Sequence, residues 1–127
     1  MNFVDQDDVP WIEGEGYRKK ILLRDDALNA KGTLVQIVEL APHARVEDHH
    51  HESCTEVFHV MRGQGTFEID GRVFELRPGD TLTCEPGEVH NTRNPHSEPF
   101  TYIVFKTNVV DNDLFWEPRS PRNGEHG

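Results

Sequence analysis

The sequence predicts an all-β fold in which short antiparallel strands form a sandwich or barrel. Runs rich in β-branched and aromatic residues recur about every 8–12 residues, and Gly, Pro, Asn and Asp separate them. No segment longer than a turn or two places its apolar residues at the 3.6-residue spacing of a helix. The length of 127 residues suits one domain with one core.

The strands are expected where these runs occur. Residues 33–40 (TLVQIVEL) fit a buried strand that Pro42 ends, and residues 56–61 (EVFHVM) fit a second strand that ends before Gly63. Further short strands are expected at 80–84, 89–93 and 99–107.

A β-hairpin is expected around Asp70-Gly71, a pair favoured in two-residue turns. Pairing across this turn places Phe67 opposite Phe74. The same register gathers four apolar side chains on one face of the hairpin: Phe67, Ile69, Phe74 and Leu76.

The two ends of the chain are less regular. Residues 21–30 (ILLRDDALNA) fit a helix or a strand equally well, so residues 1–32 are expected to form an arm with an edge strand or a short helix. Residues 108–127 are expected to form a polar, loosely attached tail. Leu114, Phe115 and Trp116 are the tail residues suited to docking on the body.

Charge and composition exclude several function classes. The formal net charge of −10 disfavours binding to nucleic acid or to anionic membranes. No apolar run approaches the roughly 20 residues of a membrane helix, and the acidic start lacks the pattern of a signal peptide. The two cysteines, Cys54 and Cys84, are too few for a disulfide scaffold. We therefore expect a cytoplasmic protein.

A histidine cluster carries the expected chemistry. His49 and His51 have the i, i+2 spacing that puts two side chains on one face of a strand. Glu56 begins the next strand, and His90 follows a glycine-containing turn further along. Three imidazoles and one carboxylate suit a divalent transition ion such as Fe, Mn, Ni, Cu or Zn.

These residues resemble the two motifs of the cupin superfamily. The first motif, G-x5-H-x-H-x3,4-E-x6-G, is similar to His49, His51, Glu56 and Gly63, with His43 at the position of its leading Gly. The second, G-x5-P-x-G-x2-H-x3-N, is similar to Gly79, Gly87, His90 and Asn94, with Glu85 at the position of its Pro. The resemblance spans residues 33–107. It implies a jelly-roll barrel (a double-stranded β-helix), a metal held by His49, His51, Glu56 and His90, and a homodimer.

Other chemically capable residues have simpler interpretations. His50 and His59 are expected to point away from the metal ligands, and Asn94 is expected to fix the turn after His90. Cys54 fits a small buried side chain better than a functional thiol, and a Cys54–Cys84 disulfide is disfavoured in a reducing compartment. Arg62 has inward parity on its strand, so it could pair with Glu56, orient an anion or be solvated.

Fold alone does not settle the reaction. The first hypothesis is a metal-dependent enzyme acting on an oxygen-bearing small molecule, with an oxygenase ahead of an isomerase or lyase. Glu56 is then also a candidate general base. The alternative is a non-catalytic module that binds a metal and a small ligand. A cavity open to the metal ligands would favour the enzyme, and a blocked interior would favour the module.

Overall fold

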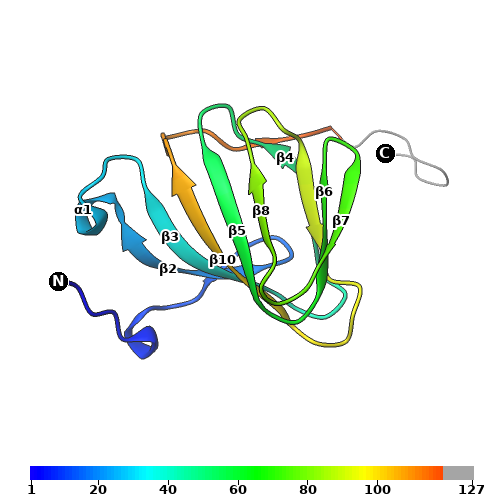
Figure 1. Cartoon of the computed structure of the whole chain (residues 1–127), viewed down its shortest axis with the longest axis horizontal. Coiled ribbons are helices and arrows are strands. Elements are labelled where there is room, and N and C mark those ends of the chain that lie inside the picture. The colour runs from blue at the N-terminus through cyan, green and yellow to red at the C-terminus, as the bar shows by residue number, and fades with distance from the viewer. Residues whose placement is uncertain (119–127) are drawn as a thin grey trace.

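The computed structural model describes residues 1–118 as two antiparallel sheets packed face to face, the jelly-roll architecture expected (Figure 1). Residues 119–127, the end of the expected tail, lie outside the described residues. One sheet has the strand order β1-β2-β3-β10-β5-β8: β1 Ile12–Glu13, β2 Arg18–Arg24, β3 Leu34–Leu40, β10 Phe100–Thr107, β5 Thr55–Arg62 and β8 Thr81–Cys84. The other has the order β11-β4-β9-β6-β7: β11 Phe115–Trp116, β4 Arg45–His50, β9 His90–Arg93, β6 Gly65–Ile69 and β7 Arg72–Leu76.

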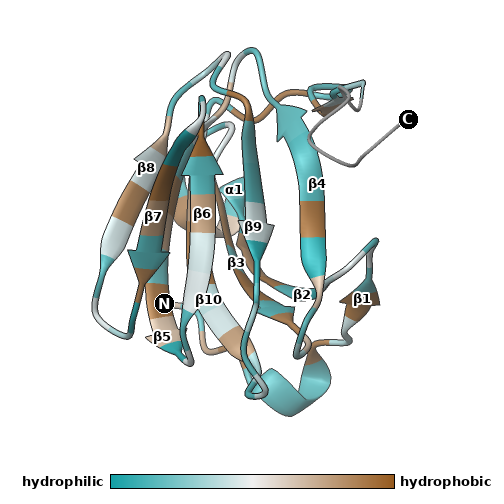
Figure 2. Cartoon of the chain, turned by 90° about the vertical axis from the view of Figure 1, so that its right-hand side faces the viewer, coloured by the Kyte–Doolittle hydropathy of each residue, from teal (hydrophilic) through white to brown (hydrophobic). Residues whose placement is uncertain are grey.

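The expected hairpin is confirmed in its register. Phe67 of β6 lies opposite Phe74 of β7, and the turn residues Asp70 and Gly71 both have positive φ, as a two-residue hairpin turn requires. Phe67, Ile69 and Leu76 are buried on the face that meets the other sheet. Hydrophobic and hydrophilic bands alternate along the strands in Figure 2, the pattern of a sheet with one covered face.

The segment 21–30 forms a strand and then a helix. Residues up to Arg24 belong to β2, which pairs with β3 and widens the first sheet, and Asp25–Leu28 form the short helix α1. Asn29 ends this helix in the left-handed conformation. The only other helical element among the described residues is a 3-10 turn, η1, at Gln6–Asp8. No helix in the part of the chain that the structure describes is long and apolar enough to cross a membrane.

The core lies between the sheets, at one end of the barrel. It is centred on the fully buried side chains of Phe67, Phe100, Leu40, Val60 and Val104. Phe58, Tyr102 and Val104 belong to this core and also line a cavity that borders it. The aromatic core is therefore the floor on which that cavity rests.

Part of the expected tail joins the second sheet. After β10, the chain crosses from the first sheet to the second in Figure 1, and β11 pairs with β4, Phe115 opposite His50 and Trp116 opposite His49. Docking by Phe115 and Trp116 is thus confirmed, and both side chains stay partly exposed. The segment reaches the histidine cluster.

Candidate metal centre

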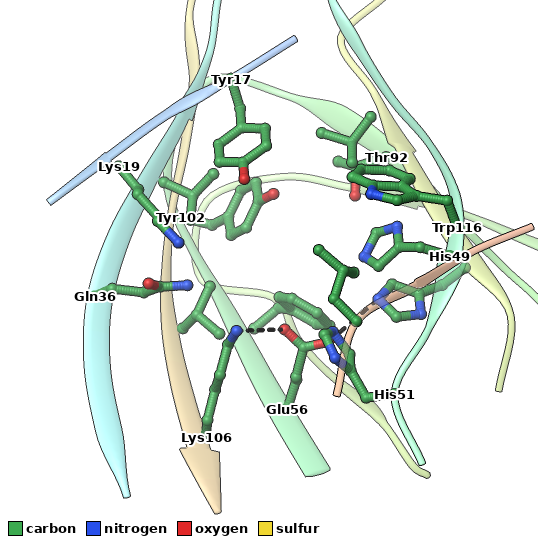
Figure 3. A pocket seen from close by; sticks show the side chains of 16 residues that line it. Tyr17, Lys19, Gln36, His49, His51, Glu56, Thr92, Tyr102, Lys106 and Trp116 are labelled. Atoms are coloured by element: carbon green, nitrogen blue, oxygen red, sulfur yellow. Dashed lines mark ion pairs between the residues drawn. The ribbon is translucent and has the colours of Figure 1, made fainter. Parts of the chain in front are cut away.

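Four side chains from three strands and one loop converge inside the barrel (Figure 3). His49 lies on β4, His51 directly follows that strand, Glu56 lies on β5 and His90 begins β9. Ring nitrogens of the three histidines lie within 4.8 Å of one another. Oε1 of Glu56 lies 3.2 Å from Nε2 of His51 and 3.2 Å from Nε2 of His90. The sequence motifs therefore bring the four residues together as expected.

A bulge in β4 aims the first histidine inward. Val46 pairs with Thr92 and His49 pairs with His90, so β4 has one more residue than β9 between these two pairs. Val46 and His49 both line the cavity. In a regular strand, two residues whose numbers differ by three would point to opposite faces. Without the extra residue, strict alternation would turn one of these side chains outward.

Each histidine is oriented through its Nδ1 atom. The Nδ1–H group of His49 donates to the carbonyl of Glu47 at 2.8 Å. The Nδ1–H group of His90 donates to the carbonyl of Glu88 at 3.0 Å. The Nδ1–H group of His51 donates to the carbonyl of Asp113 at 2.7 Å. Because a carbonyl can only accept, these contacts place the proton on Nδ1 in the neutral ring. Nε2 then carries the free lone pair and faces the other ligands. Such outer contacts commonly fix the tautomer of metal-binding histidines.

The donor set fits a divalent transition ion. Glu56 is 5% exposed, and its Oε1 is a buried atom that has no hydrogen-bond partner among the described residues, despite the two imidazoles nearby. A buried carboxylate oxygen without a partner is costly. A cation between Glu56 and the three Nε2 atoms would satisfy it. Three imidazoles and one carboxylate are suitable ligands for Fe, Mn, Ni, Cu or Zn.

The charge states of His49 and Glu56 also favour ligation. Burial and the neighbouring His90 lower the pKa of His49 to about 4, so that ring is neutral near pH 7. Burial alone would raise the pKa of Glu56, but His51, His90 and Lys106 hold it well below its usual value. A neutral imidazole and an ionised carboxylate are the forms that bind a metal.

The two cysteines are free thiols beside this cluster. Sγ of Cys84 lies 3.2 Å from Nδ1 of His90, a proximity that the sequence did not predict. Burial and the nearby Glu56 raise the pKa of Cys84, and they raise that of Cys54 to about 11. Both thiols are therefore protonated near neutral pH, and the thiolate is the form that ligates or attacks.

A cavity of about 110 Å³ opens beside the four ligands. Its wall includes residues that the sequence analysis missed, among them Lys19, Gln36 and Lys106 (Figure 3). Gln36 and Lys106 alternate in step with the buried residues of β3 and β10, so strand parity was a usable signal for them. Lys19 had no such signal, because its segment was expected to be an arm. The other lining residues are Tyr17, Val38, Val46, Phe58, Thr92, Tyr102, Val104, Leu114 and Trp116.

Arg62 does not face this cavity, and its expected inward parity is wrong. β5 and β10 pair regularly up to Val60 opposite Tyr102, and then Arg62 lies opposite Thr101. The extra residue, Met61, is a bulge that reverses the alternation, and Arg62 is exposed. Of the alternatives considered for Arg62, the structure supports the solvated side chain.

His43, His50, His59 and Asn94 do not join the ligand cluster. His59 is exposed and contacts the hydroxyl of Thr81, while the ring of His50 stacks on Phe115 and contacts Glu117. The buried amide of Asn94 donates to carbonyl oxygens of the chain before β4 and of the loop after β9, which confirms that it fixes this turn. His43 has φ +64°, a left-handed conformation at the position where the motif expects glycine.

Comparison with known proteins agrees with this geometry. The family model described as "Cupin domain" matches residues 36–106. A quercetin 2,3-dioxygenase from Bacillus subtilis is 35% identical over 96 residues, which are 67% of this chain and 28% of that protein. An oxalate-binding protein from Thermotoga maritima is 30% identical over 83 residues, which are 65% of this chain and 69% of that protein. The chain thus spans under a third of the dioxygenase but over two thirds of the oxalate-binding protein.

Solved structures share the fold. One described as a predicted oxalate decarboxylase from Thermotoga maritima has a TM-score of 0.78 and 20% sequence identity, over 85% of this chain and 100% of that chain. An identity at this level shows the fold alone. The family match covers more than half of the chain, and the sheets and the histidine–glutamate cluster agree with it. This chain is a member of the cupin family.

Proposed function

We propose that the protein is a metal-dependent enzyme that acts on a small, oxygen-bearing molecule in the cavity beside His49, His51, Glu56 and His90. The observation that carries this proposal is the open cavity of about 110 Å³ next to the convergent ligand atoms. A purely structural metal site is closed by its ligands, whereas a catalytic site keeps a position for substrate. The volume accommodates several waters or one small organic molecule.

The four ligands would hold one divalent ion, which supplies Lewis-acid polarisation or redox chemistry when bound. The chain's own contribution is to fix the imidazoles through their Nδ1 contacts and to limit the size of the substrate. Glu56 is ionised at neutral pH and can accept a proton, although His51, His90 and Lys106 all favour its anionic form. Its first role is therefore as a ligand, and its role as a general base is secondary.

Oxygenase chemistry is the first choice of reaction. It is supported by the similarity to the Bacillus subtilis dioxygenase, of which this chain covers only a part. Isomerase or lyase chemistry on a small acid is next, because the same Lewis-acid polarisation serves proton transfer and bond cleavage.

A second candidate function is a non-catalytic module that binds the metal and a small carboxylate. It is favoured by the similarity to the Thermotoga maritima protein named for oxalate binding, most of whose length this chain covers. Both candidates share the metal site and the cavity. They differ in turnover.

One experiment separates these candidates. Untagged protein, purified without a nickel column, is analysed for metals, and we expect roughly one transition ion per chain. Oxygen consumption and substrate loss are then followed against a panel of small acids and diols. Metal-dependent oxygen uptake supports the oxygenase, and substrate loss without oxygen uptake supports the isomerase or lyase. Binding without turnover supports the module.

The control is the metal-free protein. Binding to the native state alone must raise the melting temperature, so the addition of Mn²⁺, Fe²⁺ or Zn²⁺ should stabilise it. An unchanged melting temperature with all three ions would contradict the metal site itself.

The homodimer and the cytoplasmic location stay predictions. The homodimer rests on resemblance to the family. Light scattering of the purified protein, which gives its mass in solution, tests it.

A further inference from the structure

We propose that Lys19, Gln36 and Lys106 form a carboxylate-binding subsite on the cavity wall that faces the metal ligands. The inference rests on the proposed function, because it names the substrate class of the same cavity. The three residues come from the neighbouring strands β2, β3 and β10. Figure 3 shows them on one side of the cavity, with His49 and Trp116 on the other.

Lys19 is the residue that most needs an explanation. It lies between Arg18 and Lys20, whose side chains contact partners outside the cavity. The side chains of Arg18 and Lys20 both lie over the ring of Trp11, and Arg18 also pairs with Glu39. Lys19 points into the cavity instead, and its Nζ has neither a hydrogen bond nor an ion pair with any described residue. Burial and the nearby Lys106 and Arg24 lower its pKa, and the carboxylate of Glu56 offsets them only in part.

Lys106 is paired only loosely. Its Nζ lies 3.7 Å from Oε2 of Glu56, beyond hydrogen-bond distance. Among the lining residues, these two lysines face a single carboxylate. That carboxylate is also the proposed metal ligand, so a bound divalent ion would leave the wall with still less negative charge. A positive cavity in a chain of net charge −10 favours entry of an anion.

Gln36 adds a directional polar group. It is 4% exposed, and its Oε1 is buried without a hydrogen-bond partner among the described residues. A glutamine among the buried positions of β3 interrupts an otherwise apolar face. An amide can donate to a carboxylate, and turning the amide would present its oxygen to a hydroxyl. Two ammonium groups and an amide therefore form a site for a small carboxylate that also reaches the ligand cluster.

The probe for this subsite is malonate, with malonamide as a neutral molecule of nearly the same shape. Calorimetric titration of the metal-loaded wild-type protein should show binding of malonate and at least tenfold weaker binding of malonamide. Lys19→Met should weaken malonate binding about tenfold or more, the usual value of a charge-assisted hydrogen bond. Lys19→Arg keeps the cation and should stay close to wild type.

The matched control is Lys20→Met, which changes the next residue on the outer face of the same strand and should leave malonate affinity unchanged. Metal content should remain that of the wild type in all variants, because none alters a ligand. The melting temperature of Lys19→Met should be equal or higher, since an unpaired, partly buried cation is removed. A lower melting temperature with unchanged malonate affinity would assign Lys19 a structural role and overturn the subsite.

The remaining outcomes keep the two proposals distinct. Normal metal loading with equal affinities for malonate and malonamide would overturn the subsite and leave the proposed function standing. Tighter binding of inorganic phosphate than of malonate, lost in Lys19→Met, would overturn the carboxylate assignment. Failure of the wild type to load metal would overturn the proposed function, and this inference with it.

Discussion

The carbonyl oxygen of Asp113 accepts a hydrogen bond from Nδ1 of His51 at 2.7 Å, although 62 positions separate the two residues. The carboxylate of Asp113 also accepts hydrogen bonds from the backbone N–H groups of Glu52, Ser53 and Cys54. One residue near the C-terminus thus orients one proposed ligand and anchors the loop between it and Glu56. The candidate metal centre therefore depends on a segment outside the two cupin motifs.

Asp113→Ala should weaken metal binding without abolishing it. The loss of the carboxylate leaves three backbone donors of the loop to water and loosens the position of His51. Changes to such outer contacts typically cost about 10–100-fold in metal affinity. Titration against a competing chelator measures this loss. Asp111→Ala, an exposed acidic residue two positions earlier, is the matched control and should retain wild-type affinity. Equal affinity in both variants would refute the anchoring role.

Local chemistry made much of the fold predictable. The hairpin of β6 and β7 followed from Asp70-Gly71, because the turn fixes the register and the register fixes which side chains are buried. The convergence of the four candidate ligands followed from motif spacing. In both cases, the residues that determine the structure lie close together in the sequence.

The errors arose where pairing between distant strands overrides alternation. The bulges at Met61 and before His49 each add one residue to a strand, and nothing in the local sequence marks them. The inward parity expected for Arg62 failed for this reason. Lys19 was missed because β2 becomes part of the cavity wall only by pairing with β3. Long-range contacts of this kind are not encoded in any short window.

His51→Ala and His90→Ala should each lose the bound metal, whereas His59→Ala should keep it. His51 and His90 both direct Nε2 toward Glu56, whereas His59 is exposed and its Nδ1 lies 2.8 Å from the Thr81 hydroxyl. Elemental analysis gives the metal content of each variant. The stabilisation of metal-free protein by added Mn²⁺ should be absent in the first two and intact in the third. Similar behaviour of all three variants would show that these histidines do not share a metal site.

Tyr102→Phe should reduce the amount of stability that the protein loses as the pH rises into the alkaline range. Burial raises the pKa of Tyr102 above its ordinary value of 10.0, so the hydroxyl stays protonated in the folded state. The resulting stability is fully present below the unfolded pKa and declines as the pH rises above about 10, because the unfolded chain then loses the proton more readily. Melting temperatures from pH 8 to 11, measured with a chelator present, test this.

The same variant has a predictable cost at neutral pH. The side chain of Thr92 interacts with the hydroxyl of Tyr102, and removal of this hydroxyl should lower the free energy of unfolding by about 1 kcal/mol. The wild-type and Tyr102→Phe curves should therefore converge as the pH rises. Curves that stay parallel would contradict the protonated, buried state of Tyr102.

Metal binding should quench the fluorescence of Trp116 and spare that of Trp11. The centroid of the Trp116 ring lies 5.2 Å from that of His49, at the cavity wall, whereas Trp11 packs against Arg18 on the outer side of β2. Paramagnetic ions such as Cu²⁺ quench indole emission only at short range, and these two tryptophans are the only ones in the chain. In a Cu²⁺ titration, Trp11→Phe should retain the full quenching and Trp116→Phe should lose it. Quenching that persists in Trp116→Phe would place the ion near Trp11, away from the histidine cluster, and so contradict the ligand assignment independently of any activity.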